Sequence, residues 1–554
     1  MNFLEILSFV DVLKNAGNLI IDILVFAIVL AIIVAIHEFG HFIFARRGGI
    51  LCREYAIGFG PVLYKKRKGE TFYSLRAIPL GGFCAIAGEE VEEDPFKNVE
   101  KIRLEIVDGV IKGFYLFNDE SLKDIPLYTI KEYDIFDANQ TGNLYMDVEN
   151  ENGELIHYTV DPQAMLYLNK KDEYQIAPYN RTLNSKSKRR RALVMFGGPL
   201  MNFILALIVF FIVGLFTGFV DYKSTEVSYV QEGSSIYEGG LREGDKIVAF
   251  ETETLGKQEV SSWTELQEYL DKYRSDNLLD EVIKVTYVNS KNETKTIEAT
   301  PFIAINNLGI GSDYKHIGSG KVVIKAFGAL DESFGSNSEL KLNDEIIKIG
   351  NEDITSWKQV VRIFKDYNEK ESVEMVVLRD GNEVTVNVKP FTKDLMDNQT
   401  SLNGDSVPTV QVVLGISPQK KFSLIKSVGY AFTRTGDSFM AVVNTFKLLF
   451  NKTVSVTNLS GPIGIFSLTS QARAAGGILY ILQLIGLLSV NIGLLNLLPI
   501  PALDGGRLVF VGYEAITKKK PNPKVETILI TVTMLLLFGL MIIVAFSDII
   551  RLFK

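Results

Sequence analysis

The stretch that decides the fold is Ala35-Ile36-His37-Glu38-Phe39-Gly40-His41-Phe42-Ile43-Phe44, in which three ionisable side chains interrupt an apolar run. His37 and His41 are four residues apart, so they share one face of a helix. Two imidazoles on one face can bind a single zinc ion, and Glu38 on a neighbouring face can polarise a bound water. Placing an ionisable side chain at membrane depth costs on the order of 3 kcal/mol of insertion free energy. A cluster of three such side chains therefore indicates a catalytic or metal-binding role rather than core packing.

Working outward, four stretches are long and apolar enough to cross a bilayer, which takes about 20 residues per helix. They cover residues 19–45, 192–219, 478–498 and 525–546. The 554-residue chain is 47% hydrophobic and 22% charged, a combination typical of apolar spans joined to soluble domains. We therefore expect a polytopic α-helical membrane protein with four transmembrane helices.

Charge and cysteine content exclude two classes of partner or site. The net charge is −8 and there is no basic stripe with interleaved aromatic residues, so we expect no nucleic acid partner. Cys52 and Cys84 are the only cysteines, which excludes a disulfide framework and a cysteine-rich zinc site.

Basic residues predict the orientation in the membrane. Lysines and arginines cluster beside the spans, within residues 46–68, 186–191 and 518–524. By the positive-inside rule these segments face the cytoplasm. Both chain termini and the segment 221–422 are then extracytoplasmic, and the first and third spans both end at the cytoplasmic face.

A catalytic zinc site needs a third protein ligand and an open position for water. His157 and His316 are the other histidines, and both lie in segments away from the spans. The third span instead ends in Asn496-Leu-Leu-Pro499-Ile-Pro501-Ala-Leu503-Asp504-Gly505-Gly506. Its prolines should break the helix, and irregular backbone at membrane depth is tolerated where it lines a cavity. We expect Asp504 to meet His37 and His41.

The external segment contains an internal repeat. The stretch 241–250 (LREGDKIVAF) realigns on 340–349 (LKLNDEIIKI), and the only two tryptophans, Trp263 and Trp357, fall at matching places. Each copy predicts short strands, a polar turn, a helix after the tryptophan and further strands. This pattern resembles the PDZ domain, which binds an extended chain at a sheet edge. A generic small β-rich domain is the alternative.

Two further segments have distinct compositions. Residues 92–184 carry 19 Asp or Glu against 9 Lys or Arg, which predicts an acidic, β-rich cytoplasmic insert. Within it, residues 137–142 (Asp137-Ala-Asn139-Gln-Thr141-Gly142) resemble the start of an EF-hand calcium loop. Such a loop requires a bidentate Glu at its twelfth position, where this chain has Val148, so we expect a surface turn without calcium.

Apolar residues at helical spacing over 424–450 predict an amphipathic helix, which lies either on the membrane or on the protein core.

These features divide the chain into seven regions. They are 1–91 (first span with the HExxH motif and a β-hairpin region), 92–184 (acidic insert), 185–220 (second span), 221–304 and 305–393 (two extracytoplasmic PDZ-like α+β domains), 394–476 (linker and amphipathic helix), and 477–554 (third and fourth spans with the LDG motif).

The chain closely resembles the site-2 protease family of intramembrane zinc metalloproteases, in its bacterial form with external PDZ domains. The family pattern is HExxH in one core helix and NxxPxPxLDG in a later one, and both stand here. Further matches are GFGP at 58–61, RAIPLGGF at 76–83 with Gly88-Glu89, FGGPLMN at 196–202, and GPIG at 461–464. Arg507 stands where many relatives carry His, and the acidic insert lies outside the resemblance.

The resemblance implies that His37, His41 and Asp504 bind one Zn²⁺ and that Glu38 is the general acid/base. The family therefore predicts a zinc metalloendopeptidase.

The resemblance also implies substrate-binding residues. Asn491 and Asn496 would help to hold substrate near the metal, and the segment 76–89, including Gly81 and Gly82, would form a membrane-reentrant β-hairpin that contacts the unwound substrate. From the residues themselves, hydrogen bonding between helices remains open for the asparagines, as does a plain tight turn for the glycines.

Regulated intramembrane proteolysis in the bacterial cytoplasmic membrane is the implied function. Typical substrates are single-pass membrane proteins such as anti-sigma factors and signal-peptide remnants, and the PDZ-like domains would bind peptide tails or act as a size filter. The alternative is a catalytically silent membrane scaffold that binds protein tails, although retention of HExxH and LDG speaks against it. A metalloprotease with a Glu as third ligand and a zinc-dependent channel fit less well.

Overall fold

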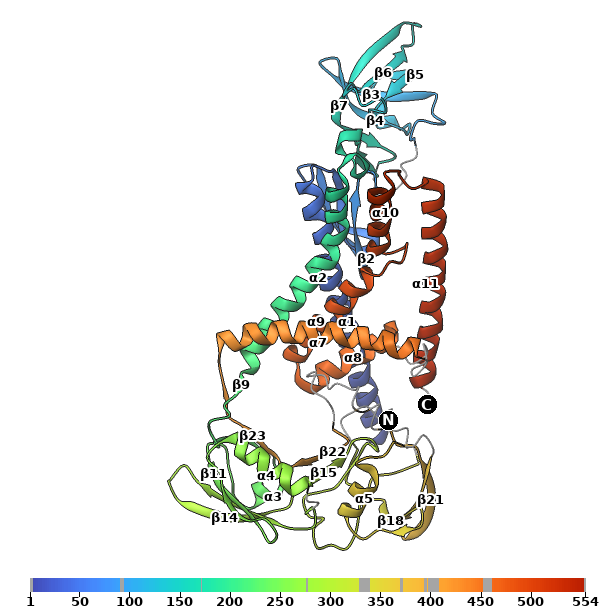
Figure 1. Cartoon of the computed structure of the whole chain (residues 1–554). Helices are drawn as coiled ribbons and strands as arrows, with labels where there is room; N and C mark the ends of the chain where they lie inside the picture. Colours follow the sequence, from blue (N-terminus) through green and yellow to red (C-terminus); the bar gives the residue numbers. More distant parts are fainter. Residues whose placement is uncertain are drawn as a thin grey trace. The chain divides into compact units, whose positions relative to one another are not determined.

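The computed structural model describes residues 3–89, 94–170, 172–275, 278–327, 339–368, 372–392, 396, 408–451 and 461–552. The chain forms two compact units, with Met1–Phe211 and Ala431–Lys554 in unit 1 and Ile212–Tyr430 in unit 2 (Figure 1). The boundaries predicted after residues 91 and 393 lie outside the described residues.

Four of the described helices are long and apolar enough to cross a membrane, which confirms the predicted spans. They lie in α1 (Phe3–Arg47), α2 (Lys188–Thr217), α9 (Ile478–Asn496) and α11 (Pro523–Leu552). On α11, the side chains of Val532, Leu535 and Phe538 are at least half exposed. A continuous apolar surface of this kind is stable when lipid covers it. The chain is therefore a polytopic membrane protein.

The helical core of unit 1 is formed by α1, α2 and α9. Val29 and Ile33 of α1, Val209 of α2 and Leu484 of α9 pack in one buried cluster. Small residues let α1 and α2 approach closely, because a Cβ atom on Gly197 would lie only 2.7 Å from the Gly40 carbonyl oxygen. Such close backbone contact is a usual source of helix association in membranes.

Besides α9, the described residues between 424 and 517 form three further helices. They are α7 (Leu424–Phe450), α8 (Pro462–Gly476) and α10 (Asp504–Thr517). Helix α7 has the bounds of the predicted amphipathic helix. Helix α8 was not predicted; Pro462 occupies its first turn, and the Asp548 carboxylate of α11 accepts hydrogen bonds from the Gly461 and Gly464 amides at 2.9 and 3.0 Å. This capping group is 84 residues or more away along the chain, so local sequence does not reveal it.

Strands β1 (Cys52–Lys68) and β2 (Thr71–Ile86) form a β-hairpin next to α1. Residues 76–86 of the segment that was predicted as a hairpin by itself are the second part of β2, because β1 supplies their pairing partners. The hairpin is bent, because residues 54–57 pair with 72–75 as well as with 82–85. Gly58 has a φ of 89°, a left-handed conformation that permits the bend. The Tyr55 hydroxyl donates to the Ala35 carbonyl oxygen at 2.6 Å and so anchors the hairpin to α1.

The acidic insert is a six-stranded sheet with its own hydrophobic core. The strand order is β4-β3-β5-β6-β7-β8, with β3 (Lys101–Val107), β4 (Val110–Tyr115), β5 (Leu127–Asp134), β6 (Tyr145–Glu149), β7 (Leu155–Tyr167) and β8 (Glu173–Gln175). In the EF-hand-like stretch, the Asp137 carboxylate accepts a hydrogen bond from the Gly142 amide at 2.8 Å. The Asp137 side chain therefore closes the loop onto a backbone amide within it, as expected for a turn.

Unit 2 contains two sheets with the same strand order, which confirms the internal repeat. The first is β12-β11-β13-β14 and the second is β19-β18-β20-β21. Their strands are β11 (Lys246–Thr252), β12 (Gly256–Glu259), β13 (Ile283–Val288) and β14 (Thr294–Ala299), then β18 (Glu345–Ile349), β19 (Glu352–Asp353), β20 (Val373–Arg379) and β21 (Asn382–Val388). Trp263 begins α4 (Trp263–Ser275), and Trp357 begins α5 (Trp357–Phe364). The short helix α3 (Ser235–Glu238) precedes the first sheet.

The matching aspartates of the two copies close the same turn. Asp245 accepts a hydrogen bond from the Arg242 amide at 2.9 Å, and Asp344 accepts one from the Lys341 amide at 2.7 Å. The residue before each aspartate has a positive φ, 87° at Gly244 and 72° at Asn343. Asparagine tolerates this conformation better than most residues, which explains why it can replace glycine in the second copy.

A third sheet corrects the predicted linker. Its order is β17-β16-β15-β22, with β15 (Phe302–Ile305), β16 (Ile310–Gly311), β17 (Ala326–Phe327) and β22 (Val410–Val413). Beyond it, β23 (Ile416–Pro418) pairs with β10 (Val227–Val230), and β24 (Lys420–Lys421) pairs with β9 (Phe219–Val220). Residues 410–421 thus belong to the sheets of unit 2 rather than to a linker, because partners far away in sequence satisfy their backbone.

We predict that Asp344→Asn destabilises unit 2 by about 2 kcal/mol at neutral pH, the usual scale for hydrogen bonds to a charged group. Burial raises the pKa of the Asp344 carboxyl, but the Arg379 guanidinium, at 2.8 and 2.7 Å, lowers it below its ordinary value. The carboxylate therefore stabilises the fold above the unfolded-state pKa of about 3.9, and this contribution is lost as the pH falls through the lower folded-state pKa. The measurement is urea unfolding followed by tryptophan fluorescence, since both tryptophans lie in unit 2.

The control is Asp353→Asn, at an exposed position of the same copy. It should unfold like the wild type at every pH. Equal stability of Asp344→Asn and the wild type at pH 7 would contradict the role assigned to the Asp344–Arg379 pair.

Candidate metal centre

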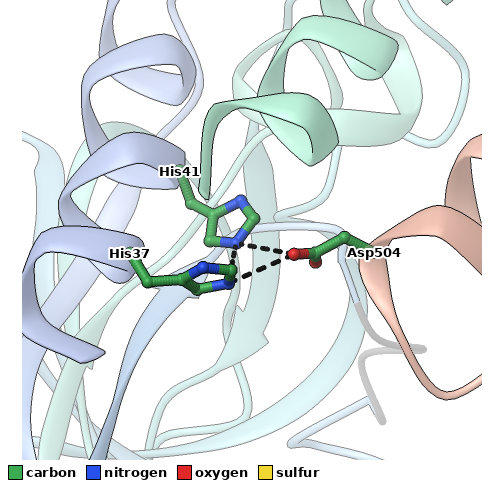
Figure 2. Close-up of side chains that lie close together, drawn as sticks. All are labelled: His37, His41 and Asp504. Atoms are coloured by element: carbon green, nitrogen blue, oxygen red, sulfur yellow. Dashed lines mark hydrogen bonds and ion pairs between the residues drawn. The ribbon is translucent and has the colours of Figure 1, made fainter. Parts of the chain in front are cut away.

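Two helices bring the three predicted ligands together (Figure 2). His37 and His41 project from α1, and Asp504 is the first residue of α10. Helix α9 ends at Asn496, and the turn that follows is closed by hydrogen bonds from the Ile500 amide to Leu498 and from the Leu503 amide to Ile500.

Glycines after Asp504 make this turn possible. A Cβ atom on Gly505 would clash with the Leu497 carbonyl, and one on Gly506 would clash with the Ile500 carbonyl. Only glycine lets α10 start directly against the preceding turn. The LDG motif therefore sets the position of the Asp504 carboxylate.

The ligating atoms lie at nearly equal distances from one another. His37 Nε2 is 3.2 Å from His41 Nε2, and Asp504 Oδ2 is 3.2 Å from His37 Nε2 and 3.4 Å from His41 Nε2. In a tetrahedral zinc site with bonds of about 2.0–2.1 Å, ligand atoms are about 3.3–3.4 Å apart. The donor set and its spacing therefore fit zinc.

Hydrogen bonding defines the tautomer of His41. Its Nδ1 lies 2.8 Å from the Val194 carbonyl oxygen, which can only accept a hydrogen bond. Nδ1 is therefore protonated, and in the neutral ring Nε2 presents a lone pair toward His37 and Asp504. Three electron-rich atoms in a buried site repel one another unless a proton or a metal ion lies among them. Two nitrogens and one carboxylate oxygen are the ligands of a catalytic zinc site with a position left for water.

A cavity of about 730 Å³ adjoins these ligands. Glu38 lines it, together with Asn496 of α9 and residues Phe83, Cys84, Ala85 and Ile86 of β2. Arg507 of α10 also lines it and forms an ion pair with Glu89 beyond the hairpin. The cavity therefore offers space for a peptide segment beside a carboxylate and the proposed metal ligands.

The predicted substrate-binding residues have different surroundings. Asn496 lines the cavity, whereas Asn491, five residues earlier on α9, is not among its lining residues. A Cβ atom on Gly81 would clash with the Phe59 ring, and one on Gly82 would lie 2.6 Å from the Ala56 carbonyl oxygen. The Phe59 ring at Gly81 and the close approach of the strands at Gly82 favour a structural role for both glycines, whereas the four residues that follow them line the cavity.

Residue types alone do not indicate the role of Gly198, although 196–202 match the family pattern. A Cβ atom there would lie 2.7 Å from His37 Nε2 and closer still to His41 Nε2. Glycine thus leaves room for both imidazoles against α2.

The fold and the site together define a class: a polytopic membrane protein with a buried cluster of two histidines and one aspartate whose donor atoms and spacing fit zinc. The Peptidase family M50 model matches residues 25–540, and the chain belongs to this family, the site-2 proteases, whose members are zinc metalloproteases. The expected cofactor is Zn²⁺.

Curated relatives are similar along almost the whole chain. The zinc metalloprotease RasP of Oceanobacillus iheyensis is 28% identical over 535 residues, covering 96% of this chain and 99% of the relative. A putative zinc metalloprotease of Staphylococcus aureus is 29% identical over 547 residues, with the same coverage. The regulator of sigma-W protease RasP of Bacillus subtilis is 28% identical over 540 residues, again with 96% and 99% coverage.

We predict that Gly198→Ala lowers the zinc content of the purified protein at least tenfold, because the added methyl group would occupy the place of the imidazole nitrogens. The measurement is zinc per chain by plasma mass spectrometry. The matched control is Gly512→Ala in α10, where an added Cβ atom meets nothing within 4 Å. A Gly198→Ala protein that keeps one zinc ion per chain would contradict the steric account.

Proposed function

We propose that the chain is an intramembrane protease that cleaves single-pass membrane proteins, with His37, His41 and Asp504 as the ligands of one zinc ion and Glu38 as the general acid/base. The observation that carries this proposal is the convergence of two imidazole nitrogens and one carboxylate oxygen beside Glu38 in the wall of a cavity. The sequence of this centre also satisfies the HExxH and LDG pattern of the family.

Each group has a defined task in this mechanism. When bound, zinc supplies a water whose pKa is lowered to about 7 and polarises the scissile carbonyl. The Glu38 carboxylate takes the proton from the attacking water and delivers it to the leaving amine. The His37 and His41 side chains are buried, and the lower dielectric around them strengthens these electrostatic interactions.

The edge of β2 supports a mode of substrate binding. Residues 82–85 pair with 54–57 on one side, and within the described residues no strand pairs with their other side. Residues 83–86 also line the cavity. A substrate segment that pairs with this edge is held extended, and its scissile carbonyl is freed from helical hydrogen bonds.

The surface of the hairpin supports its insertion into the membrane. Phe59, Val62, Leu63, Leu75 and Ile78 are exposed. Apolar side chains gathered on a short hairpin are stabilised by lipid, and the paired strands satisfy much of the backbone. We propose that β1 and β2 form the membrane-reentrant hairpin.

The proposed topology follows the positive-inside rule. Both termini and unit 2 lie outside a bacterial cytoplasmic membrane, and the metal centre lies near its cytoplasmic face.

The two repeated modules of unit 2 are proposed as PDZ-like domains that bind substrate tails or select substrates by size. A Bacillus subtilis relative is named a regulator of sigma-W protease, which supports anti-sigma factors as a substrate class. Signal-peptide remnants are a second class of single-span substrate.

We predict that Glu38→Gln abolishes cleavage, with a loss of at least 100-fold, while the protein keeps its zinc, because the amide cannot take a proton from water. Asp504→Ala should lose both zinc and cleavage. The measurement is cleavage of a single-span substrate reconstituted with the full chain in liposomes, with zinc determined on the same samples.

The control is His157→Ala, which removes an exposed histidine of the acidic insert and should leave zinc content and cleavage unchanged. Cleavage by Glu38→Gln at the wild-type rate would refute the catalytic role. Failure of the wild type to cleave any single-span substrate would favour the scaffold alternative.

A further inference from the structure

Asn202 is a polar residue in the membrane-spanning helix α2 to which the proposed mechanism gives no task. Its side chain is completely buried, and its Nδ2 lies 3.2 Å from His37 Nδ1. Its backbone is fixed as well, because the Ser489 hydroxyl of α9 donates to the Asn202 carbonyl oxygen at 2.9 Å. Asn202 is therefore held between the helix that carries His37 and the helix that leads to Asp504.

With Nδ2 facing His37, the orientation of the Asn202 amide conflicts with metal binding. His37 directs Nε2 at Asp504 Oδ2 and His41 Nε2, so a metal ion at this centre takes the Nε2 lone pair. The neutral ring then carries its proton on Nδ1, which is a donor. An NH₂ group facing Nδ1 would place two donors against each other.

The Asn202 side chain also has an unused acceptor. Its Oδ1 is buried and has no hydrogen-bond partner among the described residues. A buried amide oxygen without a partner costs about 1–3 kcal/mol. Rotating the amide by 180° exchanges nitrogen and oxygen with almost no change in shape, and this places Oδ1 against His37 Nδ1–H. The rotation removes the donor–donor contact and gives Oδ1 a partner, while the NH₂ group takes the former place of Oδ1.

We propose that Asn202 is a positioning residue for the metal centre: its side-chain oxygen accepts the Nδ1 hydrogen of His37 and so directs Nε2 at the zinc ion. This inference rests on the ligand set of the proposed function. Helix α2 then orients both histidines, because the Val194 carbonyl oxygen already accepts the Nδ1 hydrogen of His41. Such partners fix the tautomer and the ring angle of a ligand and raise its basicity.

The test is the zinc affinity of the full chain in detergent, measured by competition with a chromophoric chelator and without substrate. Asn202→Leu keeps the approximate volume and removes the acceptor. We expect its zinc affinity to fall 10- to 100-fold, as is usual for the loss of such a partner. The matched control is Gln483→Leu on α9, an amide-to-apolar change outside the cavity lining, which should bind zinc like the wild type. An Asn202→Leu affinity within twofold of the wild type would overturn the proposal.

Asn202→Asp tests the direction of the hydrogen bond. An ionised carboxylate can only accept, so the proposal predicts zinc affinity equal to or above that of the wild type. If the amide instead donated to His37, Asn202→Asp would weaken zinc binding at least tenfold, and that result would overturn the proposal. Asn202→Leu tests whether the acceptor is needed, and Asn202→Asp tests the direction of the hydrogen bond. Each can overturn the proposal if the other misfolds, with thermal unfolding recorded for both.

His37→Ala separates this inference from the proposed function. It should lose zinc more severely than Asn202→Leu. If His37→Ala binds zinc normally, the ligand set itself is wrong. If His37→Ala loses zinc but Asn202→Leu binds it like the wild type, the ligand set stands and the positioning role fails.

Discussion

The structure depends on one electrostatic constraint: His37 Nε2, His41 Nε2 and Asp504 Oδ2 lie 3.2–3.4 Å apart in a buried site. Three electron-rich atoms at this spacing are stable only with a cation among them. The constraint explains why helix α1 carries ionisable residues within its apolar, membrane-spanning stretch. It also explains why the chain after α9 breaks into a turn, since Asp504 has to reach two histidines that are over 460 residues earlier.

Small residues and hydrogen-bond acceptors on α2 make this arrangement possible. Gly197 allows α1 to approach, and Gly198 leaves space for the imidazoles. Val194 orients His41 through its carbonyl oxygen, and Asn202 contacts His37. A helix that carries none of the three proposed ligands therefore shapes the site. This division of tasks is typical of metal centres, in which the surrounding groups determine the geometry of the ligands.

Features that depend on local pattern could be predicted from the sequence, and those that depend on distant partners could not. Apolar length predicted the four spans, and spacing pointed to His37 and His41. The positive-inside rule then led to the expectation that Asp504 lies near them. The cap of α8 by Asp548 and the pairing of β22 with β15 join segments 84 to 111 residues apart, so no local signal marks them. Gly198 and Asn202 stood in a recognised motif, but their tasks follow only from the positions of the imidazoles.

Zinc K-edge X-ray absorption of the purified wild-type chain tests the central claim most directly. The account predicts a first shell of nitrogen and oxygen only, at about 2.0–2.1 Å, with the scattering pattern of two imidazoles and no sulfur. Cys84 lines the same cavity, so a sulfur shell at about 2.3 Å is the clear alternative. A sulfur shell, or a first shell with fewer than two imidazoles, would contradict the account.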